Sequence, residues 1–283
     1  MSQRVLLCPP TYFDVVDSKN PYMSGKLPVS RQKARQQWDN LCAALRQCGC
    51  EVETINPVPG LEDMVFAANP IFVGWSELVG KFIVASHMVH PSRQREVEHF
   101  VKWYREHGYK EIDLDLGDER LEGHGDALWH PDWSRVYVGY GFRTTRGGAN
   151  KLVAAMSTMG IPAVPLELVN PYCYHLDTCL CPLNNEAVLI YPGAYSPESL
   201  ATLRTHWKRV HELTEEEACQ FMGNGIVAGG RYLTSHITPH LDGMLKQEGL
   251  TPLIVDTSEF EKAGGSCFCM KAFLPESKPS ILT

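Results

Sequence analysis

Short runs of β-strand character alternate with helical patterns from one end of this chain to the other, and no linker or low-complexity segment interrupts them. The strand runs are rich in Val, Ile, Leu and aromatic residues, which favour extended backbone. Strands are predicted at residues 4–8, 51–55, 71–75, 79–86, 111–114, 135–140, 163–165, 187–191, 225–229, 251–255 and 267–272. This alternation predicts an α/β fold.

Helices are predicted at residues 30–47, 92–107, 149–159, 197–209, 215–221 and 239–247. The first has apolar side chains at intervals of four, three, four and three residues along one helical face: Ala34, Trp38, Leu41, Leu45 and Cys48. Ser30 is its expected N-cap, and Gly49 follows its end. The helices recur about every 50 to 60 residues, which indicates a repeated unit of several strands and one helix, with strands toward a shared centre.

The 283 residues are expected to form a single domain, residues 1–283. The formal net charge is -7, from 26 basic and 33 acidic side chains, and no basic run stands out, which argues against a nucleic-acid partner. No apolar run approaches the ~20 residues that a membrane span needs. The first residues lack the apolar stretch of a signal peptide, so a cytoplasmic location is expected.

The ten cysteines are expected to be free thiols in a reducing compartment. Three pairs are separated by a single residue: Cys48 and Cys50, Cys179 and Cys181, Cys267 and Cys269. Structural zinc sites usually use pairs of cysteines separated by two to four residues, together with further Cys or His ligands. The sequence therefore predicts no metal site.

One cysteine segment has the features of a nucleophile. Residues 264–270 read Gly-Gly-Ser-Cys-Phe-Cys-Met, and a Gly-Gly turn lets the backbone approach a ligand closely. A buried thiol on a strand is the alternative interpretation. Alternation does not choose between Cys267 and Cys269, because residues i and i+2 of a strand share a face.

Three further segments place polar residues among glycines or in apolar runs. His175 and Asp177 would point the same way from an extended chain, and a histidine suits proton transfer near neutral pH. Glu122 and Asp126 lie in Glu-Gly-His-Gly-Asp, and Asn69 lies in an apolar run before a proline. A core histidine, solvated turn carboxylates and a turn asparagine are the respective alternatives.

A cysteine, a histidine and several carboxylates together suit chemistry on a guanidinium group. Carboxylates bind its N–H groups in the bidentate manner of arginine–acid pairs. A thiolate attacks the carbon between the three nitrogens, and an imidazolium protonates the departing amine. The sequence thus predicts a small-molecule guanidino substrate, and this chemistry needs no metal or organic cofactor.

The ordered segments resemble the guanidino-modifying enzymes of the pentein superfamily. The resemblance runs from Cys-Pro-Pro-Thr-Tyr at residues 8–12 to Gly-Gly-Ser-Cys-Phe-Cys at residues 264–269. It implies a propeller of five ββαβ units around a central channel. It also implies that the nucleophile stands five residues after the first glycine of the Gly-Gly turn, which selects Cys269 over Cys267.

The resemblance implies roles for the other motif residues as well. His175 would be the acid/base, Asp177 a guanidinium ligand, and Glu122 the neighbour of the histidine. Asp126 resembles a further polar residue of the same site. Arg93 and Arg143 resemble the family's positions for the substrate α-carboxylate, with surface arginines as the alternative.

Two asparagines select a branch of the superfamily. Asn69, and Asn20 in an Asn-Pro context, resemble the arginine dihydrolases, which release ornithine, carbon dioxide and ammonia from arginine. Arginine deiminases usually have aspartate at the first position, and dimethylarginine dimethylaminohydrolases usually have lysine where this chain has Asp177. A deiminase, a dimethylarginine hydrolase, an amidinotransferase and a non-catalytic propeller that binds a partner remain alternatives. A homo-oligomer is compatible with the sequence.

Overall fold

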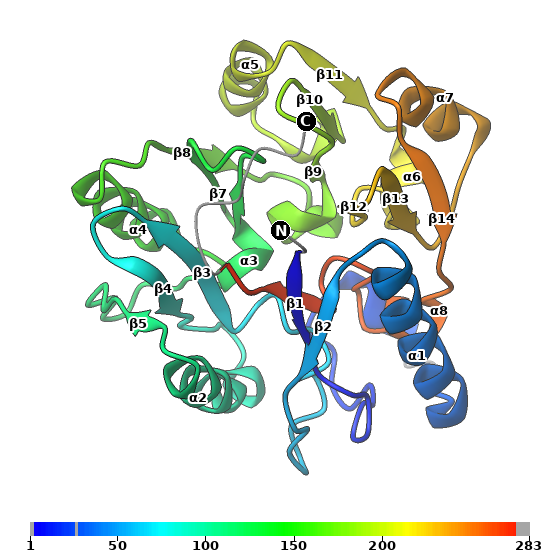
Figure 1. Ribbon diagram of the computed structural model, residues 1–283, viewed down its shortest axis with the longest axis horizontal. Coiled ribbons are helices and arrows are strands. Elements are labelled where there is room, and N and C mark those ends of the chain that lie inside the picture. The colour runs from blue at the N-terminus through cyan, green and yellow to red at the C-terminus, as the bar shows by residue number, and fades with distance from the viewer. Residues whose placement is uncertain (1–2, 26–27, 276–283) are drawn as a thin grey trace.

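The computed structural model describes residues 3–25 and 28–275. Within these ranges five three-stranded sheets lie around a common centre, and the longer helices lie on the outside (Figure 1). The sheets are β15-β1-β2 (Lys271–Phe273, Arg4–Leu7, Glu51–Thr54), β3-β4-β5 (Ile71–Ser76, Gly80–Ala85, Lys110–Glu111), β6-β7-β8 (Ala127–Trp129, Val136–Tyr140, Ala163–Glu167), β9-β10-β11 (Leu180–Pro182, Ala187–Ile190, Arg209–Glu212) and β12-β13-β14 (Ile226–Ala228, Arg231–Thr234, Thr251–Ile254).

The α-helices fall into one long helix per sheet and several short ones. The long helices are α1 (Arg31–Gln47), α2 (Pro91–Glu106), α4 (Arg146–Thr158), α5 (Pro197–His206) and α7 (Pro239–Gln247). The short ones are α3 (Gly123–Asp126), α6 (Glu215–Cys219) and α8 (Ser258–Glu261), and 3-10 helices cover Pro21–Gly25, Pro171–Cys173, Leu176–Thr178 and Pro192–Ala194.

Each sheet is a ββαβ unit. Its first two strands are antiparallel, a long helix follows the second strand, and the third strand returns parallel to the second. One unit is shared by the two ends of the chain, because β15 pairs antiparallel with β1 while β1 pairs parallel with β2. The expected repeat of strands and one helix is therefore confirmed, and five such units are present in the described residues.

The helices begin where the sequence provides caps. Ser30 caps α1 by accepting a hydrogen bond from the backbone N–H of Lys33, as the sequence predicts. Thr145 and Thr238 cap α4 and α7 in the same way. The apolar face of α1 packs into the core through residues that include Ala34, Trp38, Leu41 and Leu45. Burial of these faces, more than helix propensity, fixes the helices on the outside of the sheets.

Two expected elements are wrong. The helix expected at residues 197–209 ends at His206, because Arg209 begins β11 and pairs with Ala187 of β10. The strand expected at residues 267–272 begins only at Lys271, and residues 267–270 form a turn. The side-chain oxygen of Asn224 accepts hydrogen bonds from the backbone N–H groups of Ser266 and Cys269, and so replaces the partners of a strand.

Strands β6, β9, β11 and β13 lie outside the strand ranges predicted from the sequence. They have three or four residues each, and β11 alternates charged and apolar side chains over too short a run to stand out. In the parts of the chain that the structure describes, no helix is long and apolar enough to cross a bilayer.

The central strands carry much of the folding energy, so truncation of Leu6 in β1 is a test of the core. Its side chain is fully buried, and Leu6→Ala is expected to lower the free energy of unfolding by about 2–5 kcal/mol. Leu78 is 74% exposed, and Leu78→Ala is expected to change the same quantity by less than about 0.5 kcal/mol. Urea titrations followed by circular dichroism measure both, and equal losses would contradict the assignment of β1 to the core.

Candidate active site

Six of the residues that the sequence singles out line one buried cavity, although they come from widely separated parts of the chain. They are Asn20, Asn69, Arg93, Arg143, His175 and Cys269. The cavity is also lined by Lys19, Asp63 and Tyr174, which sequence reasoning did not select. Arg93 and Arg143 are 5% and 6% exposed, so the interpretation of them as surface arginines is wrong.

Cys269 lies in the turn between the Gly-Gly pair and β15. Its sulfur is 3.1 Å from Oδ2 of Asp177 and accepts a hydrogen bond of 3.2 Å from Nδ2 of Asn224. The other carboxylate oxygen of Asp177, Oδ1, is buried and has no hydrogen-bond partner in the described residues. Such an oxygen next to the sulfur suits a ligand with N–H groups.

Asn224 is a site residue that sequence reasoning missed. It is fully buried, and besides contacting the sulfur it donates to the backbone oxygen of Asp177 at 2.9 Å. One amide thus ties the turn that contains Cys269 to the segment that contains Asp177. Its signal in the sequence is the run Gly223-Asn224-Gly225 before β12, where an amide lies between two glycines.

His175 is oriented by a buried carboxylate. Its Nε2 donates to Oε2 of Glu122 at 2.7 Å, and Nη1 of Arg143 donates to the same oxygen at 3.0 Å. The other oxygen of Glu122 accepts from the backbone N–H of Val89 at 3.0 Å. His175 precedes the 3-10 helix Leu176–Thr178, so the extended chain expected there is wrong.

Asn69 presents an unpaired amide nitrogen. Its Oδ1 accepts from Nη1 of Arg93 at 2.9 Å, which fixes the orientation of the amide, and its Nδ2 is buried with no hydrogen-bond partner in the described residues. Glycine is required at position 125, because a Cβ there would lie 2.4 Å from this nitrogen and 3.1 Å from the His175 ring. Arg93 also pairs with Glu96 at 3.1 Å.

Asp126 is not among the residues that line the cavity. Its two oxygens accept hydrogen bonds from Oγ1 of Thr144 at 2.7 Å and from the backbone N–H of Leu176 at 3.1 Å. Burial raises the pKa of Asp126 well above its ordinary value. Its carboxyl group thus fixes the segment that follows His175, and a direct contact between Asp126 and the substrate stays a prediction, as it does for Asp177 and Glu122, which also do not line the cavity.

Asn20 and Tyr174 form one wall of the cavity near the Gly-Gly turn. Asn20 donates to the backbone oxygen of Ala263 at 2.9 Å, and the Tyr174 hydroxyl donates to that of Gly264. Gly264 has φ +88°, and a Cβ there would lie 2.6 Å from both Asn20 and Tyr174, so only glycine fits. The guanidinium of Arg143 lies 4.7 Å from the centre of the Tyr174 ring.

Burial favours the uncharged forms of most of the groups at the site. Burial, with the neighbouring Asp177 carboxylate, raises the pKa of the Cys269 thiol well above its ordinary value. Burial raises the pKa of Asp177 to about 7 and lowers that of His175 to about 4. Burial opposes ionisation of Glu122, but Arg143 and His175 hold its pKa below the ordinary value. A thiolate here therefore requires a compensating cation.

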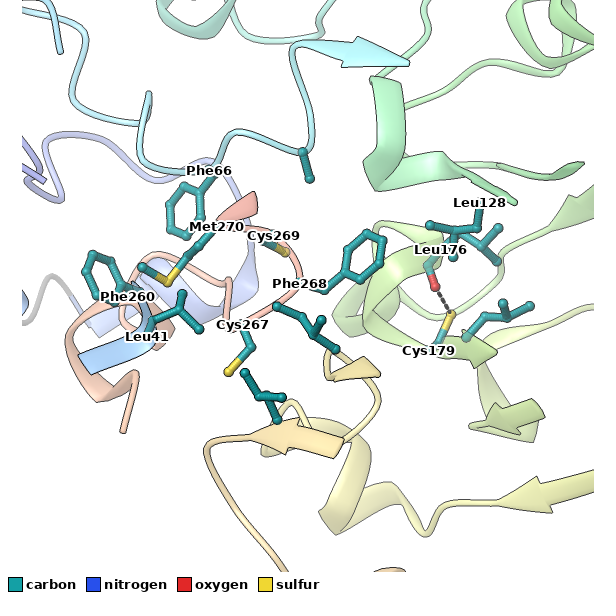
Figure 2. Packing of buried hydrophobic residues seen from close by; sticks show 14 of the residues in the cluster. Leu41, Phe66, Leu128, Leu176, Cys179, Phe260, Cys267, Phe268, Cys269 and Met270 are labelled. Carbon is teal, nitrogen blue, oxygen red and sulfur yellow. Dashed lines mark hydrogen bonds between the residues drawn. The ribbon is translucent and has the colours of Figure 1, made fainter. Parts of the chain in front are cut away.

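The two cysteines of the turn have different surroundings. The side chains of Cys267 and Cys269 point in different directions, with that of Cys269 on the side of Phe66 (Figure 2). Both cysteines are buried in the same apolar cluster, but only Cys269 lines the cavity. In the described residues no group of three or more His, Cys, Asp or Glu side chains is placed to hold a metal ion.

Five ββαβ units that bring a cysteine, a histidine and carboxylates to one buried cavity define the pentein class. The family model described as N,N-dimethylarginine dimethylhydrolase, eukaryotic, matches residues 18–274. The chain belongs to this dimethylarginine dimethylaminohydrolase family.

Curated relatives include two kinds of enzyme. The bifunctional arginine dihydrolase/ornithine cyclodeaminase ArgZ of Synechocystis sp. is 32% identical over 94% of this chain and 37% of its own length. The N(G),N(G)-dimethylarginine dimethylaminohydrolase of Mycobacterium tuberculosis is 31% identical over 95% of this chain and 84% of its own length. The chain thus spans little more than a third of the cyanobacterial relatives it matches, at 37% of each.

Solved structures agree with this assignment. The N-terminal domain of ArgZ, as a cysteine-to-serine mutant bound to substrate, has a TM-score of 0.89 at 29% identity and covers 98% of this chain and 99% of that domain. The same domain has been solved as an asparagine-to-serine variant covalently bound to a reaction intermediate, with a TM-score of 0.89 at 30% identity, 98% of this chain and 99% of that one.

The different surroundings of the two sulfurs generate a labelling prediction. 2-Chloroacetamidine, a small amidine cation, is expected to alkylate a single thiol, and Cys269→Ser is expected to slow that reaction at least about 1000-fold because it removes the sulfur that lines the cavity. Cys267→Ser is the matched control and is expected to react at the rate of the unmodified protein. Intact-mass spectrometry measures both, and retained labelling of the Cys269 variant would contradict the site.

Proposed function

We propose that this protein is an arginine dihydrolase, which converts arginine into ornithine, carbon dioxide and two molecules of ammonia through two attacks by the Cys269 thiolate. One observation carries the proposal. Cys269, His175 and Asn69, whose amide nitrogen is unpaired, line one buried cavity, and the Asp177 carboxylate lies 3.1 Å from the Cys269 sulfur. Its substrate is thus a small guanidino compound.

Arginine binding activates the nucleophile in this proposal. Oδ1 of Asp177, which lacks a partner, accepts from the guanidinium N–H groups, and the cation offsets the burial that keeps the Cys269 thiol protonated. The cavity has a volume of only about 20 Å³ in this state, close to that of one water molecule. Side chains at its mouth must therefore move when arginine enters.

His175 transfers the protons. The Nε2 of His175 is bonded to Glu122, so Nδ1 is the nitrogen that exchanges protons with the thiol and the substrate. The contact with Glu122 also fixes the orientation of Nδ1. Thiolate attack on the guanidinium carbon gives a tetrahedral adduct, and protonated His175 donates to the departing ammonia. The result is a covalent thiouronium intermediate on Cys269. Neutral His175 then deprotonates a water that attacks this intermediate, which releases a citrulline-like ureido product.

The second round acts on the ureido product before it leaves. The Asn69 amide donates through Nδ2 to the neutral ureido oxygen, where an aspartate would repel it. The Cys269 thiolate attacks the ureido carbon, His175 protonates the departing ornithine amine, and water releases the carbamoyl group as carbon dioxide and ammonia. Asn20 lies on the adjoining wall and helps to hold the product in place.

The substrate α-carboxylate is assigned to Arg93 and Arg143, the two buried guanidinium groups of the cavity. Arg143 is the stronger candidate, because it donates only to Glu122 and to the backbone oxygen of Lys19, whereas Arg93 donates to Glu96, to Asn69 and to two backbone oxygens. The α-amino group is assigned to Asp63, whose Oδ2 lies 3.0 Å from Lys19 and whose oxygens have no other hydrogen-bond partner in the described residues.

The second candidate activity is dimethylarginine hydrolysis, which the family description and the Mycobacterium tuberculosis relative favour. The same nucleophile and acid/base serve both reactions. A deiminase would stop after the first ammonia, and an amidinotransferase would pass the amidino group to an amine. Asn69, and the aspartate at position 177, support the dihydrolase among these.

The five units are taken as blades of a propeller around a central channel, and residues 1–283 as a single domain. Pairing of the last strand with the first supports both. A cytoplasmic location is supported by the ten cysteines, all of which are free. The absence of a cofactor and of a nucleic-acid or membrane partner, and the compatibility of the chain with a homo-oligomer, remain expectations from the sequence.

Counting products tests the proposed reaction. With arginine, the protein is expected to form one ornithine and two ammonia per substrate consumed, measured by amino-acid chromatography and an ammonia assay. Asn69→Asp is expected to accumulate citrulline with one ammonia, because the carboxylate repels the ureido oxygen. Citrulline accumulation by the unmodified protein would exclude the dihydrolase, and dimethylamine release from dimethylarginine at a higher kcat/KM would favour the second candidate.

The role of Arg143 is tested by comparing arginine with agmatine, which lacks the α-carboxylate. Arg143→Lys is expected to raise KM for arginine about 10-fold or more, because a bidentate carboxylate contact is lost. KM for agmatine is expected to change little. Equal changes for both substrates would show that Arg143 acts only through Glu122, to which it donates at 3.0 Å.

A further inference from the structure

A buried lysine that the proposed reaction does not use lies two residues after the nucleophile. The side chain of Lys271, the first residue of β15, is fully buried. Its Nζ has no hydrogen-bond partner in the parts of the chain that the structure describes. A buried amine with neither a hydrogen bond nor a close anion is costly, so its retention calls for a compensating interaction.

Two aromatic faces supply part of that compensation. Nζ of Lys271 lies 3.4 Å from the centre of the Phe268 ring and 3.3 Å from that of Phe273, and the two rings are inclined at 71°. The faces of phenyl rings attract cations, and they do so most strongly where water is excluded. This arrangement suits an ammonium group far better than a neutral amine.

The titratable groups that face Lys271 come from several elements. They are Asp177 and Cys269 of the site, Cys50 between α1 and β2, Cys181 of β9, and His124 of α3. His124 is held neutral by burial, which lowers its pKa to about 3, and burial raises the pKa of Cys50 to about 11 and of Cys181 to about 12. Among these groups only Asp177 and a Cys269 thiolate are left to carry negative charge near pH 7.

The protonation of Lys271 is therefore coupled to that of Asp177 and Cys269. Burial lowers the pKa of Lys271 well below its ordinary value, while Asp177 and Cys269 act in the opposite direction. In turn Lys271 favours the ionised form of Asp177. An anion on Asp177 or on the sulfur draws a proton onto Lys271, and the ammonium then favours the anion.

We propose that Lys271 is a positioning residue for the nucleophile: caged between Phe268 and Phe273, its ammonium is an internal counter-charge to Asp177 and the Cys269 thiolate. The substrate cation approaches the sulfur from the cavity, whereas Lys271 is not among the residues that line the cavity. The thiolate thus has two cationic partners: Lys271 within the protein, and the substrate in the cavity. This inference rests on the proposed function only in taking Cys269 as the nucleophile.

The test is the pH dependence of Cys269 alkylation by iodoacetamide in the absence of substrate, in the full chain. Lys271→Met keeps the length of the side chain and removes its charge. It is expected to raise the apparent pKa of the thiol by at least about one unit, so that alkylation at pH 7 slows about 10-fold or more. Lys208→Met is the matched control, since that side chain is 73% exposed, and it is expected to leave the profile unchanged.

Circular dichroism and protection of Cys269 by arginine establish that the variant is folded. An unchanged profile in folded Lys271→Met would overturn the proposal. If that variant does not fold, Phe273→Leu, which removes one face of the cage but keeps the amine, is expected to shift the profile upward, and no shift there would overturn it equally. Failure of arginine to protect Cys269 in the unmodified protein would instead count against the proposed function.

Discussion

The pairing of β15 with β1 is the constraint on which the rest of this structure depends. It joins the last described strand to the first and completes the fifth ββαβ unit. The turn that contains Cys269 leads directly into β15, so the same pairing fixes the nucleophile. The backbone oxygen of Cys269 also accepts from Ala68, which ties this turn to the segment of Asn69. The contacts that complete the fifth unit therefore also position residues of the candidate site.

The arrangement of the five sheets buries the residues of the site, and this burial determines their protonation states. Burial alone would make Cys269, His175 and Asp177 poor participants, because each is driven toward its uncharged form. Glu122 differs, because Arg143 and His175 compensate its charge and hold its pKa below the ordinary value. The site is thus arranged to become reactive when a cation enters, which limits reaction of the thiol with other molecules.

Much of the site was predictable because its residue types have few alternative uses. A histidine in His-Leu-Asp, carboxylates among glycines and a cysteine after Gly-Gly contribute little to the packing of an apolar core. Six of the nine predicted residues line the cavity. Asn224 was missed because an asparagine between glycines also suits an ordinary turn. Sequence gives no indication of whether a carboxylate such as that of Asp126 faces a cavity or a backbone N–H.

The sequence by itself determined the α/β class, a repeat of several strands and one helix, and the types of residue available for catalysis, because hydrophobic periodicity and turn residues act over a few positions. Strand alternation left Cys267 and Cys269 open and the resemblance selected Cys269, whereas only the tertiary structure showed that Cys269 alone of the two lines the cavity, in a turn held by Asn224. The tertiary structure also decided that Arg93 and Arg143 are buried and that Lys271 lies between two rings. These outcomes depend on contacts between residues far apart in the chain, and local sequence does not encode the direction in which a side chain meets them.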